Sequence, residues 1–171
     1  MHAPGSDSMA KIHADQPLLP SVIDRLIDDD PDITRDPPKS RFQILSKLKQ
    51  SVRLDLENLL NTRRRVLPMP TELHELERSM VSYGVPDATG AGFGSPEGRE
   101  RFRREVEAVI IRWEPRFKDV RVVLIDPAEE LERTVHFRIE ALLLVDPAPE
   151  PVAFDSALEP STGNIEIRGV N

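Results

Sequence analysis

The chain of 171 residues contains no cysteine, which excludes disulfide bonds, thiolate zinc sites and a cysteine nucleophile. Aromatic residues are scarce, with one tryptophan, one tyrosine and six phenylalanines. The longest apolar run spans only Ala141 to Val145, whereas a helix that crosses a bilayer needs ~20 residues. Residues 1–16 are polar and hold no signal-peptide core. The sequence therefore predicts a cytoplasmic protein that does not insert into a membrane.

Positive charge is in the minority. The chain has 23 Lys and Arg against 30 Asp and Glu, a formal net charge of -7. A net negative charge repels the phosphate backbone and disfavours nonspecific binding to nucleic acid. No nucleic-acid partner is therefore expected.

Motifs that carry catalysis are missing as well. The chain has no G-x-S-x-G elbow, and the glycine-rich stretch 90–94 lacks the Lys-Ser/Thr ending of a P-loop. A pair of carboxylates would suit glycoside cleavage, with Glu114 as the candidate acid, but the sequence assigns no second carboxyl group. A protein without catalytic residues, cofactor or metal is the favoured interpretation.

Sixteen prolines mark the boundaries of the expected elements, because proline disfavours the interior of helices and of central strands. The window 39–67 predicts a helix behind a Ser40/Gln43 capping box. Arg63 to Arg65 are expected at its carbonyl end, where the helix dipole favours cations. The apolar positions on one face of this helix are Leu45, Leu48, Val52, Leu56 and Leu59.

Two further helices are predicted. One runs from about Thr71 to Tyr83, with Leu73, Leu76 and Met80 facing inward and Gly84 as its stop. The other begins at Ser95-Pro96-Glu97 and ends at Glu114, because Pro115 follows. Its inner face holds Phe102, Val106, Val109 and Trp113.

The hydrophobic period then changes from 3.6 to 2. Strands are predicted around residues 120–125, 135–144, 152–158 and 165–168. The expected fold is α+β, with N-terminal helices packed on a C-terminal antiparallel β-meander. The expected organisation is a disordered tail over 1–17, a partner-docking arm with a short helix and linker over 18–38, and a single domain over 39–171.

The arm carries an apolar stripe at helical spacing, behind Ser21 as a possible cap. A helix this short is marginal in water, so its stripe must dock on a surface. Docking on a partner and folding back onto the chain's own core are equally weighted hypotheses. The residues of the stripe are Leu19, Ile23, Leu26 and Ile27.

An unusual cluster, Glu114-Pro115-Arg116, stands where the last helix stops and the first strand begins. The fork of an arginine is shaped to bind a carboxylate with two hydrogen bonds, and the proline stiffens the joint. The spacing leaves two alternatives open at even weight. Glu114 and Arg116 either form internal pairs that lock the helix to the sheet, or present a charged latch to a partner protein.

Three motifs in sequence carry a resemblance: residues 56–63 (LENLLNTR), residues 82–87 (SYGVPD) and above all Glu114-Pro115-Arg116 before a valine-rich strand. Together with the arm sequence LLPSVIDR at 18–25, they resemble the TssE family of bacterial type VI secretion. This family belongs to the phage baseplate-wedge and sheath-initiator proteins, which are sometimes labelled lysozyme-like. The resemblance spans about residues 19–169.

The resemblance implies a structural part of a cytoplasmic baseplate docked at the inner membrane. It implies the wedge proteins TssF and TssG and the sheath proteins TssB and TssC as partners, with other subunits such as TssK nearby. Glu114, Pro115 and Arg116 match the family's hallmark motif, which is associated with holding the wedge together. Sheath initiators of this kind offer a strand edge to the first sheath ring. The expected edge here is the hairpin 152–168, with Ile165 and Ile167 as partner-binding residues.

Two alternatives to this hypothesis are kept. A wedge protein of a phage tail shares the same parts, and the sequence alone does not separate it from a secretion subunit. A lysozyme-like enzyme that cleaves peptidoglycan is less favoured, because it would need export and a carboxylate pair beside a sugar groove.

Overall fold

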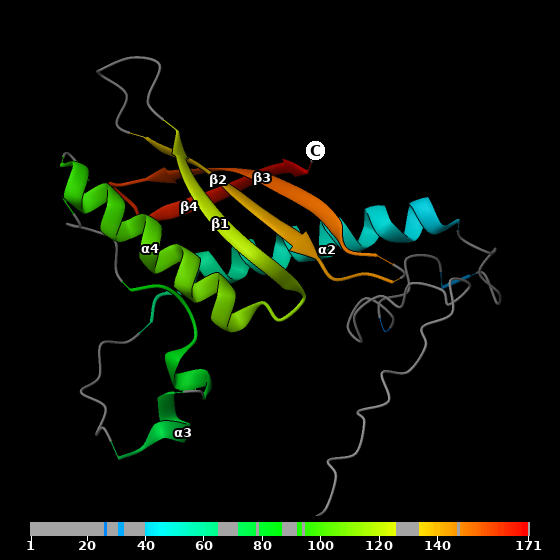
Figure 1. Cartoon of the computed structure of the whole chain (residues 1–171), viewed down its shortest axis with the longest axis horizontal. Helices are drawn as coiled ribbons and strands as arrows, with labels where there is room; N and C mark the ends of the chain where they lie inside the picture. The colour runs from blue at the N-terminus through cyan, green and yellow to red at the C-terminus, as the bar shows by residue number, and fades with distance from the viewer. Residues whose placement is uncertain are drawn as a thin grey trace, which may run out of the picture.

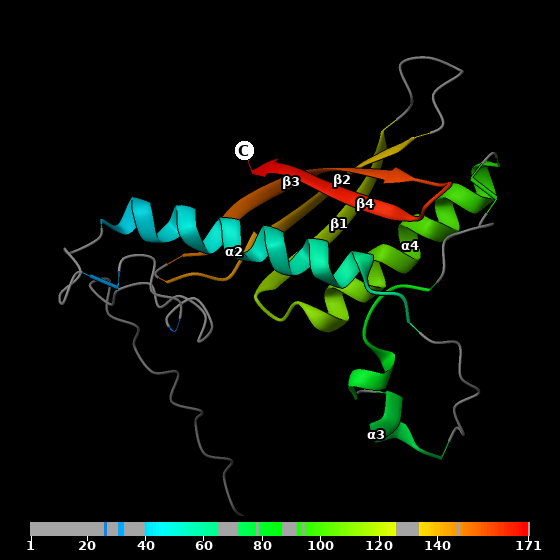
Figure 2. The same cartoon turned by 180° about the vertical axis from the view of Figure 1, so that it is seen from behind.

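A computed structural model of the chain describes residues 26, 31–32, 40–64, 72–77, 79–86, 92–93, 95–125, 134–146 and 148–170. Two long helices, α2 and α4, lie against a four-stranded sheet (Figures 1 and 2). The helices precede the strands in the chain, and the strands follow one another across the sheet. The predicted α+β fold with a C-terminal meander is confirmed.

Helix α2 spans Arg41–Asn61 and begins with the predicted capping box. The hydroxyl of Ser40 accepts from the amide of Gln43 at 3.3 Å, and the Gln43 side chain accepts from the amide of Ser40 at 2.8 Å. Four of the five predicted apolar positions are buried together with one further leucine, and Leu45 is half-buried. The buried residues are Leu48, Val52, Leu56, Leu59 and Leu60.

The end of α2 differs from the prediction. Because the helix stops at Asn61, Arg63 and Arg64 lie beyond its last turn. Arg63 instead pairs with Val85 in an isolated parallel bridge, and its guanidinium donates to the carbonyl of Thr162. Arg65 lies outside the described residues.

The predicted helix over 71–83 is wrong. The chain forms a single turn, α3 (His74–Glu77), and a 3-10 turn, η1 (Met80–Ser82), in a segment that projects from the domain (Figure 2). Leu73 and Met80, expected to face inward, are 52% and 72% exposed. Too little apolar surface covers this segment to stabilise a longer helix.

Gly84 ends this segment at a close backbone approach. Its φ is +98°, which favours glycine. A Cβ atom at this position would lie 2.2 Å from the carbonyl oxygen of Thr62. That carbonyl accepts from the amide of Val85 at 2.9 Å. Only glycine therefore lets the chain pass this close to the end of α2.

Helix α4 spans Pro96–Trp113 and confirms its predicted start and end. The hydroxyl of Ser95 accepts from the amide of Gly98 at 3.1 Å, and Glu114 is the C-cap. On its outer face, Arg103 pairs with Glu100 at 2.9 Å and with Glu107 at 2.8 Å. The inner face buries Phe102, Val106, Val109 and Ile110.

The sheet consists of β1 (Phe117–Ile125), β2 (Val135–Leu143), β3 (Glu150–Glu159) and β4 (Asn164–Val170) in the order β1-β2-β3-β4. All neighbours are antiparallel, as predicted. Helix α4 contacts β1, and α2 contacts β4 (Figure 2). The two helices therefore lie over the two edges of the sheet.

The core lies between the helices and one face of the sheet. Phe93, Phe102 and Phe137 stack edge to face with ring centroids 5.3 and 5.5 Å apart, which joins α4 to β2. The opposite face carries charge, including an ion pair between Arg138 and Asp155 at 2.7 Å. This division matches the alternation of a sheet with one buried face.

Candidate partner-binding site

The joint between α4 and β1 holds the predicted Glu114-Pro115-Arg116 cluster. The amide of Glu114 donates to the carbonyl of Ile110 at 2.9 Å, and Pro115 cannot continue the helix. The amide of Phe117 then donates back to the carbonyl of Glu114 at 3.1 Å, which closes a tight turn. The backbone thus fixes the spacing of the two charged side chains.

Arg116 binds Glu114 with two side-chain hydrogen bonds. Its Nε donates to Oε1 at 2.6 Å, and its Nη2 donates to Oε2 at 2.5 Å. The backbone amide of Arg116 adds a third bond to Oε1 at 3.2 Å. Glu114 is only 5% exposed. Glu114 therefore forms an internal pair with Arg116, and its buried carboxylate is not accessible to a partner.

Arg116 also reaches across to α2, where its Nη2 donates to Oδ2 of Asp55 at 2.6 Å. These hydrogen bonds, first to Glu114 and then to Asp55, raise the pKa of Arg116 above its ordinary value. The side chains of Arg116 and Asp55 are 27% and 50% exposed. The two residues form the exposed part of the charged network, which ties α2 to the helix–strand joint.

Tyr83, from the 79–86 segment, lies near enough to the network for its charges to act on the phenol. Its ring packs edge to face on Trp113, with centroids 5.3 Å apart. Burial raises the pKa of Tyr83, and the charges of Asp55 and Glu114 raise it further. Sequence reasoning found Glu114 and Arg116 but missed Asp55 and Tyr83. A lone aspartate on a helix surface gives no signal in the sequence.

Tyr83 provides a direct test of this network, because it is the only tyrosine of the chain. We expect its phenol to ionise at a higher pH than that of an ordinary tyrosine, because its pKa is raised. A pKa raised in the folded state stabilises the fold below the unfolded pKa, and this stabilisation is lost as the pH rises through the folded pKa. Ultraviolet absorbance of the tyrosinate measures the titration. In Asp55→Asn the pKa should fall toward its ordinary value without reaching it, because burial remains. An unchanged pKa in this variant would contradict the electrostatic effect of Asp55 on Tyr83.

The edge of β4 is the second predicted site. The side chains of Ile165 and Ile167 are 1% and 2% exposed, because the alternation of β4 points them into the core. Partner binding by Ile165 and Ile167 stays a prediction, and it would have to use their backbone groups, because their side chains face the core. Only their backbone groups face the edge.

Helix α2 covers the backbone groups of Ile165 and the carbonyl of Ile167. The side-chain amide of Asn61 accepts from the amide of Ile165 and donates to its carbonyl, both at 2.8 Å. Arg53 donates to the carbonyl of Ile167 at 3.0 Å. An Asn side chain carries the same donor and acceptor as a peptide group. Asn61 thus takes the place of one residue of a neighbouring strand and closes this part of the edge.

The apolar arm falls mostly outside the described residues, since this applies to Leu19, Ile23 and Ile27. Leu26 is described and is 78% exposed. Within the described part of the chain, no three Asp, Glu or His side chains gather as a group that could hold a metal ion. No helix in the same part is long and apolar enough to span a membrane.

Comparisons with known proteins place this fold in a family. The family model described as "Baseplate wedge protein gp25" matches residues 46–148. This segment is more than half of the chain and runs from α2 past β2. The chain belongs to the gp25 family of baseplate wedge proteins.

A solved structure described as "The baseplate complex from the type VI secretion system" contains a chain similar to this one. The two chains share 20% sequence identity with a TM-score of 0.47. The similarity covers 66% of this chain and 94% of that chain. A comparison with curated protein sequences found no match.

Proposed function

We propose that this chain is the TssE subunit of a bacterial type VI secretion baseplate. In this role it binds the wedge proteins TssF and TssG, near further subunits such as TssK. It also starts the polymerisation of the TssB–TssC sheath by pairing with a strand of the first ring. Membership in the wedge family and the motifs around Glu114-Pro115-Arg116 support the proposal. The chain would carry out this role in the cytoplasm, at a baseplate docked to the inner membrane.

The observation that carries the proposal is the end of β4, where Gly169 is exposed and no described strand pairs with the outer edge. An edge strand exposes unpaired amides and carbonyls, so another chain can extend the sheet. Helix α2 covers the backbone of Ile165 and the carbonyl of Ile167. The strand continues past this cover to Val170. Strand addition is therefore assigned to residues after Arg168.

We place the wedge contact at the charged network and at the apolar arm. Arg116 and Asp55 are its exposed members, while Glu114 and Pro115 hold the arginine in position. The arm residues Leu19, Ile23, Leu26 and Ile27 would add an apolar stripe to the same contact. The chain region 18–38 then acts as a docking arm on the domain 39–171.

Deleting residues 169–171 tests the sheath-initiator role. We expect normal binding to TssF–TssG and loss of fluorescent sheath foci in cells, because the free strand end is gone. The core side chains of Ile165 and Ile167 stay in place, whereas a deletion from Gly163 would remove them. Deletion of Asn171 alone is the matched control and should leave the foci unchanged. Normal foci with the larger deletion would refute strand-edge initiation.

A phage-tail wedge protein is the second candidate, because the family description covers that role. Co-purification with TssF–TssG separates the two, since a phage-tail subunit has no reason to bind them. An enzyme that cleaves peptidoglycan fits less well. A general acid must carry a proton, whereas both carboxylate oxygens of Glu114 accept hydrogen bonds from Arg116.

A further inference from the structure

The uncovered end of β4 begins at a bulge. Asp155 pairs with Arg168 and Phe154 pairs with Val170, so Gly169 is an extra residue between them. Its φ is +29°, a value that favours glycine. A Cβ atom placed on Gly169 would meet nothing within 4 Å. The space beside the bulge at Gly169 is therefore open in the described part of the structure.

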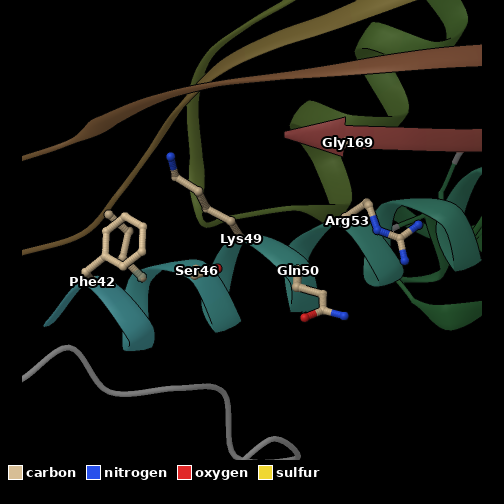
Figure 3. A pocket seen from close by; sticks show the side chains of 7 residues that line it. Phe42, Ser46, Lys49, Gln50, Arg53 and Gly169 are labelled. Carbon is tan, nitrogen blue, oxygen red and sulfur yellow. The ribbon is translucent and has the colours of Figure 1, made fainter. Parts of the chain in front are cut away.

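That space is a groove between α2 and the end of β4. Six residues of α2 from Phe42 to Arg53 line it together with Gly169, and its volume is about 460 Å³. Figure 3 shows Arg53 beside the end of the strand, and Lys49 and Phe42 on the part of α2 that continues past it. Phe42 is 80% exposed, although it is a large apolar side chain. We call this cavity the α2–β4 groove.

The lining of the α2–β4 groove is positively charged. Its lining contains two cations, Lys49 and Arg53, and no carboxylate. Arg53 forms an ion pair with Glu57 at 2.9 Å and donates a hydrogen bond to the carbonyl of Ile167. No carboxylate among the described residues pairs with Lys49. On a chain of net charge -7 this lining is a local exception, and it is complementary to an acidic side chain.

We propose that the α2–β4 groove receives an extended segment of a sheath subunit that carries an acidic and an apolar side chain. The segment pairs with β4 at Gly169 by backbone hydrogen bonds. Its acidic side chain meets Lys49, and its apolar side chain covers Phe42. Backbone pairing supplies the affinity, and the two side-chain contacts set the register. This inference rests on the proposed function, which requires only that the strand end bind the sheath.

Charge reversal tests the cationic contact. The probe is the purified TssB–TssC heterodimer, and the sample is the full chain bound to TssF–TssG. Lys49→Glu should weaken binding of the heterodimer at least tenfold. Lys47→Glu makes the same change of net charge on the same helix outside the groove lining, and should leave binding within about twofold. Equal losses in both variants would show a nonspecific charge effect and would overturn the groove.

Photo-crosslinking identifies the occupant. Phe42 is replaced by p-benzoylphenylalanine in the full chain, with the same change at the exposed Leu54 as the control. A crosslink from position 42 to TssB or TssC, absent from position 54, supports the proposal. Crosslinks to residues 1–39 of the same chain or to a second copy of it would overturn it.

The two proposals fail differently. If deletion of residues 169–171 abolishes sheath foci while Lys49→Glu and Phe42→Ala bind the heterodimer like the wild type, the groove is refuted and the initiator role stands. If the wild-type chain neither binds the heterodimer nor supports foci, the initiator role is refuted and the groove proposal falls with it.

Discussion

Glu114→Gln is expected to lower the free energy of unfolding by about 3 kcal/mol. Removing one partner of a buried ion pair costs about 3–5 kcal/mol, because the other charge stays behind without its counterion. Arg116 keeps Asp55 and is 27% exposed, which places the loss at the low end of that range. Denaturant unfolding followed by fluorescence measures the change. Trp113, the only tryptophan, lies directly before Glu114 and reports on the joint.

Asp55→Asn is the matched control, since it also removes one carboxylate from Arg116. Asp55 is 50% exposed, so we expect a loss below about 1 kcal/mol. Binding to TssF–TssG should nevertheless weaken, because Asp55 belongs to the exposed part of the network. Equal destabilisation by the two variants would contradict the different burial of the carboxylates. Unchanged wedge binding in Asp55→Asn would remove this network from the wedge contact.

Asn61→Ala is expected to cost about 2 kcal/mol and to make the chain self-associate. The change leaves the amide and the carbonyl of Ile165 without partners, and each unsatisfied group costs about 1–3 kcal/mol when water reaches it poorly. An opened edge strand is also a template for pairing with another copy of the chain. Unfolding curves and sedimentation at several concentrations measure the two effects.

Asn58→Ala controls for the loss of an asparagine from the same helix. Asn58 is exposed, and only its backbone carbonyl takes part in the hydrogen bonds around the end of α2. We expect it to be near neutral in stability and to remain monomeric. Similar behaviour of the two variants would show that the contact of Asn61 with β4 does not close the edge.

Local patterns predicted much of the fold. Helix α4 follows from its cap, its N1 proline and the proline after Glu114, all of which act within a few residues. The four strands follow from alternation over short runs, and their short connections make antiparallel neighbours. The predicted starts of β1 and β3 were late by three and two residues, at Val120 and Val152. Strand ends are set by pairing with neighbours, which local alternation does not show.

The prediction of a helix over residues 71–83 was wrong because it could not take tertiary packing into account. Its apolar residues had the right spacing, but Leu73 and Met80 meet no surface that would bury them. A spacing pattern tells which residues share a face, and packing decides whether that face is covered. Exposed apolar residues on this projecting segment leave it without the stabilisation that a helix of that length requires.

The sequence predicted the local part of the candidate site but not its long-range contacts. Glu114 and Arg116 are two residues apart, so their pairing could be considered from sequence, although the choice between an internal and an external partner could not. Asp55 lies 61 positions from Arg116, and Asn61 lies 104 positions from Ile165. Contacts at such separations arise from the packing of α2 on the sheet. They close part of an edge that was expected to be open, at Ile165 and Ile167.

Helix α2 covers the beginning of β4, whereas the described residues leave the end of β4 uncovered. A strand that joined β4 as proposed would pair at the Val170 end and would not extend past the side-chain amide of Asn61, so the position of α2 would limit its length.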